Sequence, residues 1–235
     1  WQDVYMKFYR AWFEGDRWVQ YLRGLVTTVE VTIIALIIGV VLGVIVAVIR
    51  PAHDQQRIGH RNPVLGVVNL LCKVYVTVIR GTPMMVQLLI MGFVVFASSR
   101  NATMVGALSL GINSGAYVAE IIRGGLMSLD PGQMEAGRSL GLSYLDTMRF
   151  IVVPQAFKAI LPSLGNEFIT LLKDTSLISV VAGREIVYFA QAIVARTYEA
   201  MYPYLITAAM YLILVLIFSW LQGKLERRLR QSDRR

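Results

Sequence analysis

Charged side chains inside an apolar stretch are the residues of this sequence best suited to holding a small polar molecule. Glu167, Lys173 and Asp174 lie in the run 151–183. A charge inside such a run is costly and indicates a functional role. Helical spacing places the polar side chains on two adjacent faces, with Asn166, Thr170 and Lys173 on one and Glu167 and Asp174 on the next. Lys173 could hold the carboxylate of a zwitterion and Glu167 its ammonium; an internal ion-pair network, or a charge at a helix end, is the alternative.

A second group of candidates surrounds Pro83, at the interruption Arg80-Gly81-Thr82-Pro83 of an apolar stretch. Proline lacks an amide hydrogen and disfavours helix at the preceding residue, so a kink or an unwound turn is expected there. Unwound backbone in a membrane faces protein or a water-filled cavity. The candidate cavity residues are therefore Met84, Met85, Gln87 and Asn113. The two methionines are equally compatible with core or gate packing.

The segment GQMEAGRSLGLS, residues 132–143, is a polar island between apolar stretches. Asp130 is suited to cap a helix and Pro131 to occupy its first turn. A short helix is expected from about Gly132 to Leu140, stopped by Gly141. On it, Met134, Arg138 and Leu142 would share one face, and Glu135 and Ser139 the next. Taken alone, the segment could be a solvated connector.

The elements that position these residues are predicted to be membrane-spanning helices. Of 235 residues, 56% are hydrophobic and 16% charged, and the mean hydropathy is +0.57. This composition predicts an all-α integral membrane protein. Since a span needs about 20 apolar residues, five spans are expected, near 25–49, 63–97, 103–126, 151–183 and 202–221. Residues 1–24, rich in Trp and Tyr, are expected as an extracytoplasmic interfacial helix, 25–222 as the transmembrane domain and 223–235 as a basic tail.

Basic residues in the short loops predict the orientation. The tail 223–235 carries six of them, the polar island has Arg123, Arg138 and Arg149 in or beside it, and a further loop has Arg57 and Arg61. These segments are therefore expected in the cytoplasm, which places the C-terminus inside and, with five spans, the N-terminus outside. Residues 184–199 become an outer connection between the last two spans. Lys7 and Arg10 in the N-terminal segment weaken the bias.

Several classes of chemistry are not supported by the sequence. There is no G-x-x-x-x-G-K-[ST] motif, so the chain is not expected to hydrolyse ATP itself or to be an enzyme. Cys72 is the one cysteine, which excludes an internal disulfide. His53 and His60 lack a third ligand, so no metal site is expected. Glu120 and Arg123, three residues apart, are expected to form a structural ion pair.

The spacing around the polar island resembles a known signature. Glu135-Ala136-Gly137 is followed after three residues by Gly141 and after nine more by Ile151-Val152-Val153-Pro154. The pattern resembles the EAA motif (EAA, three residues, G, nine residues, I-x-L-P) of bacterial ABC importer permease subunits. Gly137 and Val153 are mild departures. VIRGTPMMVQL (78–88), NSGAYVAEIIRGG (113–125) and LPSLGNEFITLLKDTSLISV (161–180) further resemble the polar amino acid branch (histidine, glutamine, glutamate, arginine, opine).

The resemblance implies a type I ABC importer fold and a permease subunit that moves a polar or charged amino acid into the cell by alternating access. It implies a bacterial inner-membrane location, a second permease subunit (identical or related), two cytoplasmic ATPases that bind ATP and Mg²⁺, and an extracytoplasmic binding protein. No cofactor is expected on this chain and no nucleic acid partner; membrane lipid surrounds it. A stand-alone ion-coupled transporter or channel remains the alternative, since its helices and buried charges would look similar.

The resemblance also implies roles for two sets of residues. The polar island becomes a coupling helix that enters a cleft of the ATPase, with the contact set Met134, Glu135, Ala136, Gly137, Arg138, Ser139 and Gly141. Glu135 would meet polar or cationic groups there, and Ala136 and Gly137 would permit close backbone approach. The expected substrate set is Met84, Met85, Gln87, Asn113, Glu167, Thr170, Lys173 and Asp174. The amino acid itself stays open among glutamine, glutamate, arginine, histidine and cystine.

Overall fold

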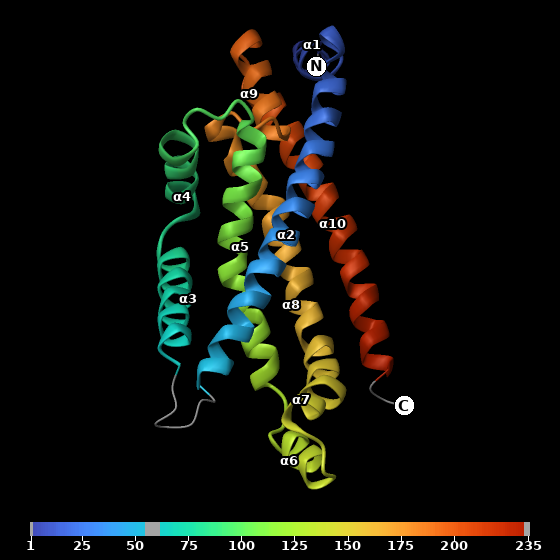
Figure 1. The fold of residues 1–235 in the computed structure, drawn as a ribbon. Coiled ribbons are helices and arrows are strands. Elements are labelled where there is room, and N and C mark those ends of the chain that lie inside the picture. The colour runs from blue at the N-terminus through green and yellow to red at the C-terminus, as the bar shows by residue number, and fades with distance from the viewer. Residues whose placement is uncertain (1, 55–61, 233–235) are drawn as a thin grey trace. The chain divides into compact units, whose positions relative to one another are not determined.

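The regular elements of the computed structural model, which describes residues 2–54 and 62–232, are all helices (Figure 1). The α-helices are α1 Gln2–Trp12, α2 Arg17–Asp54, α3 Pro63–Gly81, α4 Met84–Ile90, α5 Ala102–Met127, α6 Gly132–Ser139, α7 Tyr144–Thr147, α8 Val153–Asp174, α9 Ile186–Thr197 and α10 Met201–Ser232. Short 3-10 turns cover Glu14–Asp16 (η1) and Thr175–Val181 (η4), and π-helical turns cover Met91–Val95 (η2) and Met148–Val152 (η3). The predicted all-α class is confirmed.

The number of possible spans agrees with the sequence. Four helices of the described chain are long and apolar enough to cross a membrane: α2 with its preceding turn, α3, α5 and α10. The segment Tyr144–Val181 and α9 form a further pair, bent by 45°, which gives a fifth if they are one span. The helix expected from residue 25 begins at Arg17, so the N-terminal segment outside it is α1 and η1.

Residues 184–199, expected as an outer connection between the last two spans, contain helix α9, Ile186–Thr197. The side of the membrane on which they lie stays a prediction. The buried positions of α9, Ile186, Ala190 and Ile193, follow helical spacing. The charged flanks Arg184, Glu185 and Arg196 obscured this short apolar period in the sequence.

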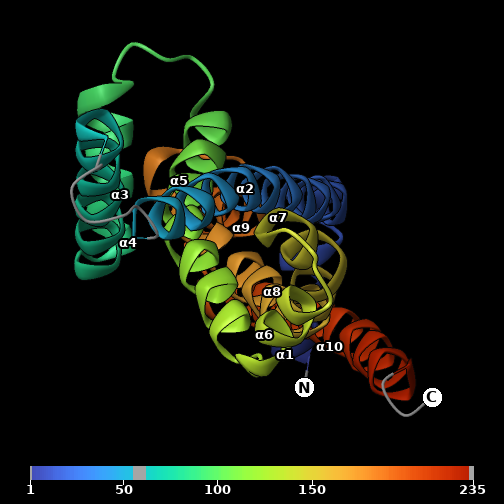
Figure 2. The same ribbon diagram turned by 60° about the horizontal axis from the view of Figure 1, so that its bottom comes forward.

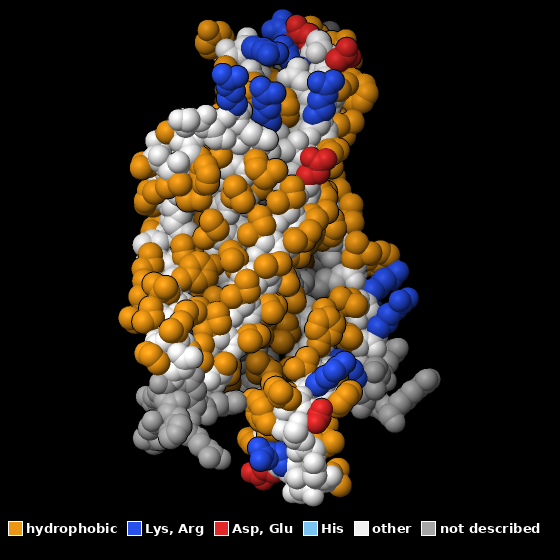
Figure 3. Space-filling view, in the orientation of Figure 1, with side chains coloured by type: hydrophobic (Ala, Val, Ile, Leu, Met, Phe, Trp, Pro, Cys, Tyr) orange, Lys and Arg blue, Asp and Glu red, His pale blue; other side chains and the backbone are white. Residues whose placement is uncertain are grey.

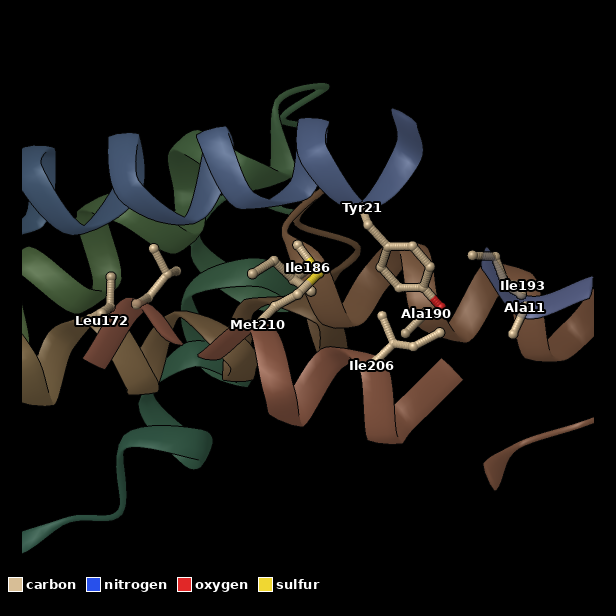
Figure 4. Packing of buried hydrophobic residues seen from close by; sticks show 9 residues of the cluster. Ala11, Tyr21, Leu172, Ile186, Ala190, Ile193, Ile206 and Met210 are labelled. Carbon is tan, nitrogen blue, oxygen red and sulfur yellow. The ribbon is translucent and has the colours of Figure 1, made fainter. Parts of the chain in front are cut away.

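The described chain packs as two compact units, and the first comprises Trp1–Ile37, Thr82–Gly111 and Phe168–Leu221. One of its cores joins α2, α9 and α10, where Tyr21, Ile186 and Ile206 are buried together (Figure 4). A Cβ added at Gly24 would lie 2.8 Å from the Cα of Ile186, so the backbones of α2 and α9 approach closely. A second core joins α2, α4, α5, α8 and η4.

A buried carboxylate organises the break between η4 and α9. Glu185 is fully buried and its carboxylate accepts the backbone N–H groups of Val187 and Tyr188, each at 2.8 Å. The Tyr211 hydroxyl of α10 donates to the same carboxylate at 2.8 Å. Ala182, at φ 63°, turns the chain just before it. The carboxylate therefore caps α9, where the helix dipole favours a negative charge.

The second unit comprises Ile38–Gly81, Ile112–Glu167 and Gln222–Arg235. Its core joins α2, α3 and α5 through Val46, Cys72, Val76, Ala116 and Ala119. Close approach of α2 and α5 depends on small residues: a Cβ at position 43 would lie 2.5 Å from a methyl carbon of position 118. This packing is typical of membrane helices, where small residues let backbones meet.

The outer faces of the helices differ in polarity. Hydrophobic side chains cover the visible faces of α2, α3 and α4, whereas charged side chains of both signs gather over α1 (Figure 3). On α1, Lys7 pairs with Asp3 at 3.3 Å and with Glu199 at 3.8 Å, and the hydrogen bond to Asp3 holds the pKa of Lys7 above its ordinary value. The rings of Tyr5 and Tyr9 lie 6.3 Å apart on an exposed face. Such a helix suits a membrane–water boundary.

Candidate functional site

The polar island folds as the short helix α6, Gly132–Ser139, one residue shorter than expected. Asp130 accepts the N–H of Gly132 through its carboxylate at 2.8 Å, ahead of the first turn. At the other end Gly141 has φ +84° and donates to the carbonyl of Arg138 at 3.0 Å, while Leu142 donates to the carbonyl of Gly137 at 3.2 Å. This pair of bonds is a Schellman motif, which confirms the predicted stop at Gly141.

One face of α6 is fixed to the following helices. Gly137 is buried, and a Cβ there would lie 2.5 Å from Thr147 Cγ2 and 3.1 Å from Ile151 Cδ1. Gln155 at the start of α8 donates to Gln133 at 3.0 Å. Figures 1 and 2 both show α6 beside α7 at the start of α8. Gly137 therefore serves close packing within the chain. Its predicted part in the ATPase contact stays a prediction.

The opposite face of α6 is exposed. Glu135 and Arg138 form no ion pair within the part of the chain that the structure describes. Two leucines project beside them, with Leu140 exposed by 82% and Leu145 by 75%. The exposed members of the predicted coupling set are thus Glu135, Ala136, Arg138, Ser139 and Gly141, whereas Met134 is half-buried. Charged groups beside exposed leucines are typical of a protein-binding surface.

Replacing Gly137 with valine tests the packing of α6. The new side chain would overlap Thr147 and Ile151, so we expect the thermal midpoint of the purified permease to fall, by an amount equivalent to about 1–3 kcal/mol of overpacking. Ser139→Val is the matched control, because Ser139 is exposed on the same helix and carries the same valine penalty. Equal midpoints for the two variants, measured by scanning fluorimetry, would contradict the assignment.

The predicted break at Pro83 is confirmed. Helix α3 ends at Gly81, Pro83 is extended with ψ 135°, and α4 begins at Met84. The Gln87 amide donates to the Thr82 hydroxyl at 2.8 Å and to the Thr82 carbonyl at 3.1 Å. Gln87 therefore supplies hydrogen bonds to the unwound turn itself, in addition to any role toward a substrate.

The predicted substrate residues of the first unit lie on α4 and α8. Met84 packs against the core that also contains Leu171 of α8, and Met85 is 36% exposed. On α8, Thr170 and Lys173 are exposed and Asp174 is half-buried. The structure thus brings the start of α4 to the turn of α8 that carries Thr170 and Lys173.

The remaining substrate candidates, Asn113 and Glu167, belong to the second unit. Asn113 is half-buried on α5, and its neighbour Ser114 is fully buried. The Ser114 hydroxyl donates to the Glu167 carboxylate at 2.7 Å. This contact joins α5 to α8 and places Asn113 one residue from the partner of Glu167. Ser114 was not predicted, although it stands inside the motif NSGAYVAEIIRGG.

Other predictions concern charged and metal-binding groups. The Glu120–Arg123 pair is confirmed, with Arg123 Nη2 2.8 Å from the Glu120 carboxylate. Within residues 2–54 and 62–232, no group of three or more His, Cys, Asp or Glu is arranged for a metal ion. His60, Arg57 and Arg61 lie outside the described residues, as do the last three residues of the basic tail.

Comparison with known proteins gives a consistent result. The family described as binding-protein-dependent transport system inner membrane component matches residues 62–231. A glutamine transport system permease protein of Escherichia coli (strain K12) is 39% identical over 168 residues, covering 70% of this chain and 77% of the relative. An arginine transport system permease protein of Bacillus subtilis (strain 168) is 35% identical over 185 residues, covering 72% and 84%.

Solved structures agree with these relatives. The crystal structure of an amino acid ABC transporter with histidines is 41% identical, with a TM-score of 0.79 over 89% of this chain and 94% of that one. A methionine ABC transporter in inward-facing conformations shares the fold, with a TM-score of 0.76 at 17% identity over 92% and 99%. The chain is a multi-pass membrane protein with the type I ABC importer fold, and such a permease works with a partner permease, an ATPase and a binding protein. This chain belongs to the family of binding-protein-dependent transport system inner membrane components and is a permease subunit of an ABC importer.

Proposed function

We propose that this permease moves a polar or charged amino acid into the cell by alternating access. Two relatives carry glutamine and arginine in their names, and one related structure is an amino acid transporter. The chain offers groups of both signs for a zwitterion: the Glu167 carboxylate for the ammonium and the Lys173 ammonium for the carboxylate. Met84, Met85, Gln87, Asn113, Thr170 and Asp174 complete the proposed substrate set.

The division of α6 into a fixed face and an exposed face carries the proposal for energy coupling. Close packing of Gly137 against Thr147 fixes one face of α6 to α7. A displacement of α6 by a protein bound to its exposed face would therefore also move α7 and α8. Glu135, Ala136 and Arg138 are exposed for contact with an ATPase. Because a ligand shifts a conformational equilibrium only through differential affinity, the ATPase must bind α6 in two positions that follow its own ATP-dependent states.

The proposed assembly follows from this coupling. Two permease subunits, identical or closely related, associate with two cytoplasmic ATPases that hold ATP and Mg²⁺, and an extracytoplasmic binding protein delivers the amino acid. This chain itself then needs no cofactor. In the bacterial cytoplasmic membrane, residues 127–149 and the tail 223–235 face the cytoplasm, and α1 lies at the outer boundary. The basic residues of the tail and of the 127–149 loop support this orientation.

Reconstitution of the complete complex tests the function against a stand-alone transporter or channel. Proteoliposomes with the ATPase nucleotide sites inside should accumulate a labelled amino acid, from a panel including glutamine and arginine, only when ATP and the binding protein are both present. Uptake of the same amino acid driven by an ion gradient without ATP would instead support the stand-alone alternative. The permease alone, lacking the ATPase, serves as the control and should show no ATP-dependent uptake.

A further inference from the structure

A cavity in the second unit lies between the end of α5, the first half of α8 and the last turns of α10. Its volume is about 420 Å³, within the range of about 300–1,000 Å³ that is typical of small-molecule pockets. Ser128 and Leu129, which follow α5, form one wall, and the turns of α8 from Gln155 to Pro162 form the next. Glu226 of α10 closes a third side. We call this space the α8–α10 cavity, and its lining residues all belong to the second unit.

The lining of the α8–α10 cavity carries charges of both signs. Lys158 of α8 and Glu226 of α10 both line it, and both residues are half-buried. The Gln222 amide donates to the Glu226 carboxylate at 3.0 Å and so fixes its position. The Ser128 hydroxyl and the Gln155 amide add neutral polar groups to the wall. An ammonium and a carboxylate on different helices match the carboxylate and the ammonium of a free amino acid, because charge-assisted hydrogen bonds are the strong ones.

The dimensions of the cavity favour such a small molecule over a membrane lipid. Its wall on α8 extends from Gln155 to Pro162, which are seven residues apart and therefore about 10 Å apart along the helix axis. One leaflet of the hydrocarbon core is about 15 Å thick, so an extended acyl chain would not fit within this length. The Glu226 carboxylate would in addition repel the phosphate of a phospholipid.

The cavity lies at the end of the spans that is proposed to face the cytoplasm. Ser128 belongs to the loop 127–149 and Glu226 to the tail 223–235, both proposed to be cytoplasmic. Ser128 and Gln155 are exposed, so the cavity opens to the surface. On the proposed function, on which this inference rests, the amino acid that meets this opening is one that has already been imported.

The wall of the cavity is also linked to α6. Gln155 lines the cavity, and its amide donates to Gln133 of α6 at 3.0 Å. A molecule held between Lys158 and Glu226 would bridge α8 to α10, and would therefore restrain α8 and the α6 helix bonded to it. Such a ligand slows the transport cycle only if it binds one conformation better than the others. We propose that the α8–α10 cavity binds a free amino acid from the cytoplasm, and that this binding slows further import.

Uptake into preloaded vesicles tests this inhibitory site. The complete complex is reconstituted with ATP inside and the binding protein outside. The vesicles hold either no amino acid or a millimolar concentration of glutamine or arginine, whichever the complex imports. We expect the internal amino acid to slow the initial uptake of labelled substrate by the wild type, whereas its N-acetyl derivative, which lacks the ammonium, should not. In Glu226→Gln and in Lys158→Gln, half-inhibition should need at least about tenfold more internal amino acid, because each variant loses a charge-assisted hydrogen bond.

Glu226→Gln is the primary variant, because the glutamine oxygen can still accept the Gln222 bond. Each rate is expressed relative to the same variant in vesicles without internal amino acid. Equilibrium dialysis of the labelled amino acid against the detergent-purified complex gives the same comparison without transport. Arg227→Gln is the control, since it neutralises an exposed charge on the next residue of α10, outside the cavity lining, and it should keep the inhibition of the wild type.

Two results would overturn the inhibitory site alone. The first is wild-type uptake that internal amino acid does not slow. The second is inhibition of equal strength in the wild type and in both cavity variants, which would indicate that the amino acid acts elsewhere in the complex. Absence of ATP-driven uptake by the wild type into vesicles without internal amino acid would instead overturn the proposed function, and the inhibitory site with it.

Discussion

Replacing Glu135 with arginine is expected to reduce ATP-driven amino acid uptake by at least about 100-fold. The arginine would face the cationic groups of the ATPase that Glu135 is proposed to meet, and like charges opposed at an interface cost several kcal/mol, where each factor of ten corresponds to about 1.4 kcal/mol. Glu135 is exposed on α6 and makes no contact that holds the described fold together, so the helices should still insert and pack. The loss should therefore appear as failure to retain the ATPase on an affinity-tagged permease. Glu135→Gln, which keeps the shape and removes the charge, should give an intermediate loss.

Asp3→Arg is the matched charge reversal for the Glu135 experiment. Asp3 is 80% exposed on α1, and its exposed pair with Lys7 contributes little to stability. We expect this variant to retain the ATPase and to transport as the wild type does. Full ATP-driven uptake by Glu135→Arg would rule out the coupling role of that face of α6.

Replacing Glu167 with glutamine is expected to lower substrate uptake by about 30-fold or more, since on the proposed role it removes the partner of the substrate ammonium and such a loss costs roughly 2–5 kcal/mol. The glutamine oxygen can still accept the Ser114 hydroxyl bond, which now measures 2.7 Å, so the contact between α5 and α8 should persist. The deficit should lie in transport, with the basal ATPase rate of the complex retained. Uptake assays over a range of substrate concentrations separate a binding defect from a turnover defect.

Two further variants define what the Glu167 result means. Ser114→Ala removes the hydroxyl and keeps the carboxylate, so a purely structural role of the bond would make Ser114→Ala damaging and leave Glu167→Gln, which keeps the bond, close to the wild type. Glu226→Gln changes another partly buried carboxylate of the second unit, which accepts an amide hydrogen bond from Gln222 at 3.0 Å, and it should leave initial uptake into vesicles without internal amino acid unchanged. Normal transport by Glu167→Gln would remove this residue from the substrate site.

Local signals in the sequence account for most of the fold that was predicted. Pro83 removes an amide hydrogen, and the chain breaks there; Gly141 tolerates positive φ, and α6 stops there. Both effects are properties of a single residue and its neighbours, so they need no knowledge of the tertiary structure. The length and apolarity of the spans act in the same local way.

Contacts between distant residues could not be predicted. Glu120 contacts three arginines, from positions 50, 80 and 123, and only the last is within helical reach of it. Ser114 and Glu167 are 53 residues apart. Likewise, the need for a residue without a side chain at position 137 arises from its contact with Thr147. That contact forms only when α6 and α7 pack together. The burial of helix α9 also depends on Tyr21, which lies far from it in sequence.

The exposed leucines beside α6 affect how the permease subunit behaves before it binds its partners. Leu140 and Leu145 meet water whenever no partner covers the α6 surface, and each such side chain forgoes about 1.5–3 kcal/mol of burial. An orphan copy of this permease thus displays a hydrophobic signal of the kind that chaperones and quality-control proteases recognise. On the proposed topology the bound ATPase covers these two leucines. The surface proposed to couple the permease to the ATPase would therefore be exposed only in subunits that have not yet assembled.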